Sequence, residues 1–88
     1  MTTYKELFFK AIDQLVDTVK TKEEEVEAKN KIKVEMQNEE LRISYSNIKN
    51  KKSVKEKFRN FYKKFDTSSL SEIVEMAKDI IDIITKDA

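Results

Sequence analysis

The sequence predicts a small α+β domain in the order α-β-β-α-α, with a two-stranded antiparallel hairpin packed against helices. Two observations support this fold class. Three stretches repeat apolar residues at the spacing of one helix face, and the stretch between the first two alternates apolar and polar residues as strands do. The 88 residues are enough for a single domain over residues 1–88. The expected elements are a helix over about 4–29, a hairpin over about 31–46, and helices over about 54–65 and 70–86. An all-α helical bundle is the alternative.

The first helix is predicted to begin at Tyr4, because residues 3–6 have the T-x-x-E pattern of a capping box. Its buried face is predicted to carry Tyr4, Phe8, Ile12, Leu15 and Val19 and to be widened by Leu7, Ala11 and Val16. Asn30 is the residue expected to end this helix, as the best left-handed stop in a chain without glycine. A second capping box at residues 21–24 leaves open a break near Thr21.

The hairpin is predicted from a change of period after Lys31. Apolar residues alternate with polar ones on both sides of the polar loop 37–40: Ile32, Val34 and Met36, then Leu41, Ile43 and Tyr45. With a four-residue loop these six residues share one side of the hairpin, and Glu35 falls opposite Arg42 as a favourable pair.

The rival interpretation of this stretch is one long helix running to about Asn50. Such a helix has two opposed apolar stripes, one with Ile32, Met36 and Ile43 and the other with Val34, Leu41, Tyr45 and Ile48. It needs partners on both sides, which a chain of this size can hardly supply. The hairpin is therefore favoured.

The last two helices have the strongest patterns. A capping box at residues 53–56 precedes an apolar face with Val54, Phe58, Phe61, Tyr62 and Phe65. A further box at residues 69–72 precedes a face with Leu70, Ile73, Val74, Ala77, Ile80, Ile81 and Ile84. The other elements are expected to assemble against this final helix.

Gly, Pro, Cys, His and Trp are all absent. Without glycine no phosphate-binding loop is possible, and without histidine or cysteine the commonest general base, thiolate nucleophile and zinc ligands are missing. We therefore predict no enzymatic activity, no catalytic residue, no cofactor, no metal and no small-molecule substrate. The acidic stripe Glu72, Glu75, Asp79 and Asp82 is interpreted as a solvated helix face.

Positive charge is concentrated in residues 49–66, which carry eight basic and two acidic side chains in a chain of net charge +1. The aromatic residues among these cations have core spacing, so only the charge is expected to face outward. The predicted contacts are Lys51, Lys52, Lys55, Arg59 and Lys63. We predict a macromolecular-binding accessory protein, an adaptor or inhibitor, whose basic helix surface at 49–64 meets an acidic protein surface. A nucleic-acid-binding protein using the same residues is the alternative function, and both are weighed against the simpler interpretation of this segment as a solvated helix face.

The remaining predictions concern location and assembly. No apolar run approaches the ~20 residues of a membrane span, and no secretory leader is recognised, so a cytoplasmic protein is expected. The richness in Lys, Asn and Ile is typical of an AT-rich genome, and small mobile elements such as phages carry accessory proteins of this kind. An unpaired hairpin edge is the predicted route to a homodimer.

Overall fold

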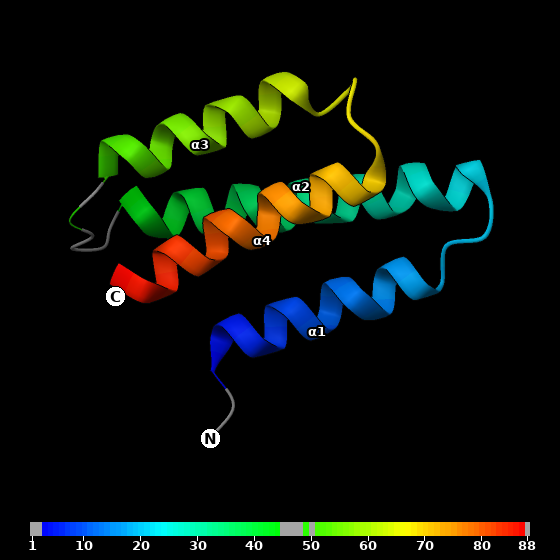
Figure 1. Ribbon diagram of the computed structural model, residues 1–88, viewed down its shortest axis with the longest axis horizontal. Coiled ribbons are helices and arrows are strands. Elements are labelled where there is room, and N and C mark those ends of the chain that lie inside the picture. Colours follow the sequence, from blue (N-terminus) through cyan, green and yellow to red (C-terminus); the bar gives the residue numbers. More distant parts are fainter. Residues whose placement is uncertain (1–2, 45–48, 50, 88) are drawn as a thin grey trace.

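Four α-helices make up the part of the chain that the computed structural model describes, residues 3–44, 49 and 51–87 (Figure 1). They are α1 (Tyr4–Asp17), α2 (Lys22–Ser44), α3 (Lys51–Lys64) and α4 (Leu70–Asp87). Successive helices run in opposite directions, with α2 and α4 in the middle and α1 and α3 on opposite sides. Helix α4 contacts all three other helices, whereas α1 and α3 do not touch each other in the described residues.

The predicted hairpin over 31–46 is wrong, and with it the α+β fold class. Residues 31–44 are helical throughout and belong to α2, and the described residues contain no strand, so the molecule is an all-helical bundle. The apolar alternation comes from two helical stripes that interleave in the sequence. Ile32 and Met36 are buried, whereas Val34 and Leu41 are exposed. Tyr45 and Ile48, placed on the second stripe, lie outside the described residues.

Helix is favoured in α2 by its composition and by its ends. The segment contains seven Glu and four Lys residues, which are good helix formers, and the loop predicted at 37–40 contains no glycine. Glu23, Glu24 and Glu25 occupy the first turn and Arg42 the last, which suits the helix dipole. No described residue has a positive φ, so the predicted left-handed stop at Asn30 is also wrong.

The capping boxes determine where three of the helices begin. The Glu6 amide donates to the Thr3 hydroxyl at 3.2 Å, as predicted. The Glu24 amide donates to the Thr21 hydroxyl at 3.2 Å, so the alternative of a break near Thr21 is confirmed and one helix over 4–29 is wrong. The Glu72 amide donates to the Ser69 hydroxyl at 3.3 Å, as expected before α4.

The capping box predicted at residues 53–56 is not the start of α3. This helix begins at Lys51, so Ser53 lies inside its first turn. The buried face is unaffected, because the apolar spacing of Val54, Phe58 and Phe61 belongs to the same helical register.

Helix α4 supplies the largest share of the core. Its buried residues are Leu70, Ile73, Ala77, Ile80, Ile81 and Ile84. They meet Phe8 and Ile12 from α1, Ala28, Ile32 and Met36 from α2, and Val54, Phe58 and Phe61 from α3, with Phe65 just beyond it. Each fully buried Ile or Phe contributes about 1.5–3 kcal/mol relative to exposure. Among the described residues no helix combines the length and the apolar character needed to cross a membrane.

Candidate interaction surfaces

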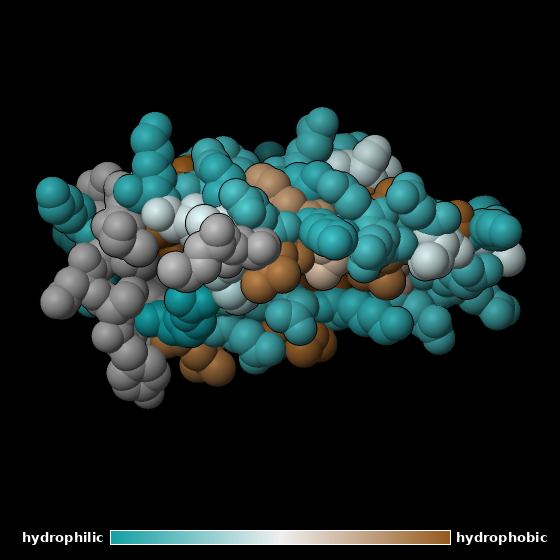
Figure 2. Space-filling view, turned by 90° about the horizontal axis from the view of Figure 1, so that it is seen from below, coloured by the Kyte–Doolittle hydropathy of each residue, from teal (hydrophilic) through white to brown (hydrophobic). Residues whose placement is uncertain are grey.

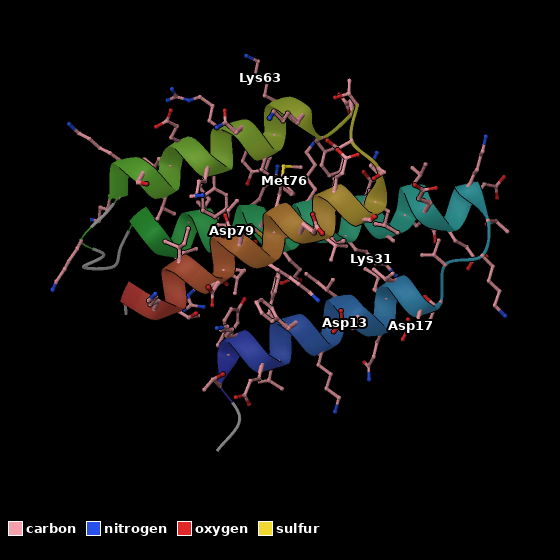
Figure 3. The ribbon with its side chains drawn as sticks, in the orientation of Figure 1. Asp13, Asp17, Lys31, Lys63, Met76 and Asp79 are labelled. Carbon is pink, nitrogen blue, oxygen red and sulfur yellow. The ribbon has the colours of Figure 1, made fainter. Side chains whose placement is uncertain are left out.

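The five cations predicted as contacts lie together along one side of α3. Lys51, Lys52, Lys55, Arg59 and Lys63 are all exposed. At 100° per residue they fall within an arc of roughly 120° and extend about 18 Å along the helix. Figure 3 shows Lys63 pointing away from the rest of the molecule. We call these five residues the cationic stripe.

The cationic stripe has no charge partner within the described part of the chain. None of its members forms an ion pair or side-chain hydrogen bond with another described residue. The neighbouring Lys57 differs, because its ammonium is 3.0 Å from the Asp79 carboxylate of α4. Lys57, which pairs across the bundle, is therefore not counted in the stripe, and no described residue neutralises the charges of the five stripe members.

The aromatic residues between these cations are part of the core, as predicted. Phe58 and Phe61 are fully buried, Phe65 is buried, and the Tyr62 ring is half-buried with its edge against Phe61 at a centroid distance of 5.4 Å. Burial, together with the nearby Glu40 carboxylate, raises the pKa of the Tyr62 hydroxyl. These rings are consequently not placed to stack on bases, and α3 offers charge alone to a partner.

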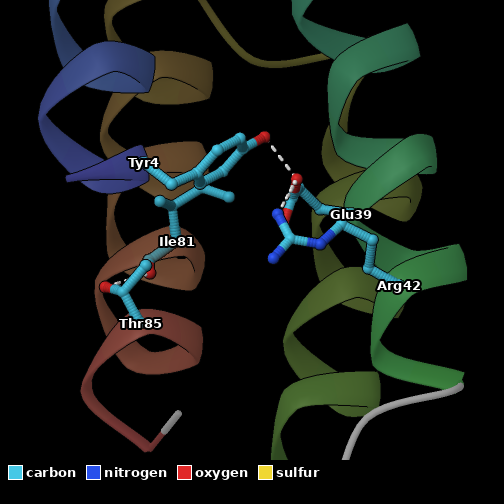
Figure 4. Close-up of polar contacts among 5 residues, drawn as sticks. All are labelled: Tyr4, Glu39, Arg42, Ile81 and Thr85. Atoms are coloured by element: carbon cyan, nitrogen blue, oxygen red, sulfur yellow. Dashed lines mark hydrogen bonds and ion pairs between the residues drawn. The ribbon is translucent and has the colours of Figure 1, made fainter.

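A buried carboxylate that the predicted hairpin placed in a polar loop lies between α1 and α2. Glu39 is 2% exposed, accepts a hydrogen bond from the Tyr4 hydroxyl, and pairs with Arg42 at 3.2 Å (Figure 4). The Arg42 guanidinium also lies 4.7 Å from the centre of the Tyr4 ring. Burial and the bond to Glu39 raise the pKa of Tyr4 to about 12. Glu39 of α2 contacts Tyr4 of α1 and Arg42 of its own helix, so it links α1 to α2, and we assign it a structural role.

The signal for Glu39 was present in the sequence but required the correct helix. In α2 the buried residues Ala28, Ile32 and Met36 recur every four positions, and Glu39 continues that stripe three residues later. The predicted hairpin assigned this glutamate to its solvated loop instead.

The acidic residues of α4 are only partly a solvated face. Asp82 forms an ion pair with Lys5 of α1, and Asp79 pairs with Lys57 of α3, whereas Glu72 and Glu75 are exposed. The bond and the attraction from Lys5 hold the pKa of Asp82 below its usual value. In the described residues no three acidic side chains are grouped so that they could hold a metal ion.

A second surface, which the sequence analysis did not identify, lies between α1 and α2. A groove of about 310 Å³ is lined mainly by apolar side chains of α1, including Leu7, Ala11 and Leu15, and bordered by Lys31 and Glu35 of α2. A second hollow beside it shares Lys31 and Glu35 and adds Asn30 and Val34. Figure 2, which looks onto the α1 side, shows hydrophobic side chains reaching the surface along this face.

We call Leu7, Ala11, Leu15, Lys31, Val34 and Glu35 the α1–α2 face. Leu7 is 55% exposed and Val34 is 54% exposed, although both are large apolar residues. The α1–α2 face and the cationic stripe belong to different helices, and α1 does not contact α3. The predicted homodimer through a hairpin edge has no basis, because residues 31–44 form no strand.

Comparisons of this chain with models of protein families, with curated proteins and with solved structures find no match.

Proposed function

We propose that this protein is a non-enzymatic binding protein, of adaptor or inhibitor type, whose cationic stripe docks against an acidic surface of a protein partner. The observation that carries the proposal is the set of five exposed cations on one side of α3, none of them paired with another described residue. A solvated lysine-rich helix usually interleaves acids with its bases, whereas α3 contains a single acidic residue, Glu56.

A protein partner fits this surface better than nucleic acid does. With +6 on residues 49–66 and +1 in total, the remainder of the chain carries −5, which opposes the field of a long polyanion. The rings of Phe58 and Phe61 are buried, so single-stranded bases have no stacking platform on α3. A compact acidic patch on a protein surface matches a stripe about 18 Å long without reaching the acidic helices.

The test compares two double charge reversals of the full chain. Lys52→Glu with Arg59→Glu alters the cationic stripe, and Lys10→Glu with Lys20→Glu alters exposed cations elsewhere that have no described partner. Each single substitution lowers the net charge by two, so both double variants carry −3 in place of +1. Affinity capture from cells of the source organism with nuclease treatment, followed by mass spectrometry, identifies what each form retains.

We expect the unaltered protein and the Lys10/Lys20 variant to retain the same acidic protein, and the Lys52/Arg59 variant to lose it. Retention of that protein by the Lys52/Arg59 variant would place the binding site elsewhere. The nucleic-acid alternative is measured separately with labelled duplex DNA, single-stranded DNA and RNA. Binding that falls steeply between low and physiological salt, and is lost only in the Lys52/Arg59 variant, would replace our proposal with that alternative.

A further inference from the structure

The α1–α2 face is an apolar surface that no described element of the chain covers. Helix α2 buries Ile32 and Met36 on one side and leaves Val34 54% exposed on another. Val34 lines a hollow beside the groove, and Leu7 and Ala11 of α1 line the groove itself and are exposed as well. Large apolar side chains gathered in a hollow, rather than scattered singly, are typical of a binding surface.

Two charged side chains beside the groove, Lys31 and Glu35, indicate what kind of partner binds there. Lys31 and Glu35 are exposed, lie one turn apart on α2, and form no ion pair with each other or with another described residue. A lysine four residues before a glutamate is the less favourable orientation for pairing within a helix. Their charges therefore remain available to a partner that presents the opposite order of charges.

We propose that the partner is a second copy of this chain, related by a two-fold axis through the α1–α2 face. In such an arrangement the two α2 helices run antiparallel, with Lys31 of each copy against Glu35 of the other. A two-fold interface requires a surface that is complementary to itself, and an exposed lysine and glutamate flanking an apolar groove satisfy that requirement. Val34, Leu7 and Ala11 become buried between the two copies.

The size of the face suits a weak dimer. Helices α1 and α2 have 14 and 23 residues and extend for about 21 Å and 34 Å at a width of about 10 Å each, so together they present roughly 550 Å², below the roughly 800 Å² per partner of a standard complex. A domain of this length buries a smaller share of its surface than a larger one does, so additional burial adds useful stability. The dimer leaves the cationic stripe free, because α3 lies on the opposite side of the bundle from α1 (Figure 1). Each dimer then presents two cationic stripes.

Sedimentation equilibrium of the full chain over a concentration series is the first measurement. We expect the apparent mass to rise from the monomer value of 10.4 kDa towards twice that value as concentration increases. Val34→Glu places a charge in the hollow beside the groove and weakens dimerisation at least tenfold without unfolding α2, because residue 34 is exposed. Val26→Glu is the matched control, since Val26 is 57% exposed on the same helix but lines neither the groove nor the hollow beside it.

A charge swap then tests the two-fold pairing itself. Lys31→Glu alone sets two glutamates against each other across the axis, and Glu35→Lys alone sets two lysines together, so each weakens dimerisation about tenfold. The double variant Lys31→Glu with Glu35→Lys restores opposite charges and returns the affinity to near the original value.

Three results would overturn the proposal. One is a monomer at every concentration, which would leave the face to a different partner or to solvent. Another is an equal loss of dimerisation in the Val26→Glu and Val34→Glu variants, which would place the interface elsewhere on α2. The third is a double variant that dimerises as weakly as the single reversals, which would exclude the two-fold pairing of residues 31 and 35.

Discussion

Helices α4 and α2 lie side by side in the middle of the bundle, yet they use their apolar residues in different ways. In α4 the large apolar residues face the other three helices, and six of the positions from Leu70 to Ile84 are buried. In α2 one stripe is buried and Val34 and Leu41 of the other stripe are 54% and 62% exposed. Helix α4 is thus an internal element of this chain, and α2 is internal on one side and available to a partner on the other.

The largest expected change in the free energy of unfolding follows the truncation of a buried apolar residue, and truncation of an exposed one should change it little. Ile81→Ala in α4 removes a fully buried side chain and should reduce the free energy of unfolding by about 2–5 kcal/mol. Val34→Ala in α2 removes an exposed one and should change it by less than about 0.5 kcal/mol in dilute monomer. Urea unfolding followed by circular dichroism measures both. Similar losses in the two variants would contradict the distinction between the helices.

A smaller change in the free energy of unfolding is expected at Glu39, the carboxylate that α2 buries. Tyr4→Phe removes the hydroxyl that donates to the buried Glu39 carboxylate, and should reduce the free energy of unfolding by about 1–2 kcal/mol. The folded state raises the Tyr4 pKa from 10.0 to about 12 and so favours the protonated hydroxyl. Its contribution is therefore complete below pH 10 and is lost as the pH rises through about 12.

The measurement is the difference in unfolding free energy between the original protein and the Tyr4→Phe variant at neutral and alkaline pH. That difference should shrink above pH 10. A difference that stays constant with pH would show that the hydroxyl does not depend on its proton for the contact with Glu39.

Charge reversals in the cationic stripe of α3 are expected to change the free energy of unfolding still less. Lys52→Glu with Arg59→Glu should change the free energy of unfolding by less than about 1 kcal/mol, since both side chains are exposed and make no ion pair with another described residue. Thermal unfolding of this variant and of the Lys10/Lys20 control should give similar midpoints. A markedly lower midpoint in the Lys52/Arg59 variant alone would mean that the cationic stripe is part of the folded framework.

The smallest effect concerns the surface of α4. The folded state lowers the Asp82 pKa below 3.8, so the stabilising pair with Lys5 is present above that value and is lost as the pH falls through the lowered pKa. Asp82→Asn should therefore reduce stability slightly at neutral pH and converge with the original protein in acid. Glu75→Gln, at an exposed position of the same helix without such a pair, is the control. Equal behaviour of the two variants would contradict a role for the Lys5 pair.

The sequence predicts α4 and the buried face of α3 well, because each has a single apolar stripe with one spacing. It does not predict α2, where two stripes interleave and the spacing of Ile32, Val34 and Met36 resembles a strand. The hairpin was favoured because a helix with two apolar stripes was expected to need cover on both sides. The fold instead forms the helix and leaves Val34 and Leu41 of the second stripe exposed.

The candidate surfaces were predictable to different degrees. The cationic stripe follows from charge and helical spacing, because its residues and its buried aromatic neighbours share one helix. The α1–α2 face depends on which side of α2 packs against α1, a tertiary arrangement that the spacing within one helix does not determine. Glu39 was missed for a different reason: the predicted hairpin placed it in a loop, although it continues the buried stripe of α2.

The most direct test of helix α2 and of the dimer is the reactivity of an introduced cysteine. Because the chain has no cysteine, a single introduced thiol is unique. In a hairpin, residues 34 and 36 share one face, whereas in α2 Val34 is exposed and Met36 is fully buried. We predict that in dilute protein a thiol reagent modifies the Val34→Cys variant at least about 100-fold faster than the Met36→Cys variant, which reacts only on opening of the fold. Raising the protein concentration should then slow the reaction at position 34 alone as the second copy covers it. Equal rates at the two positions would contradict the helix, and a rate at position 34 that is independent of concentration would contradict the dimer.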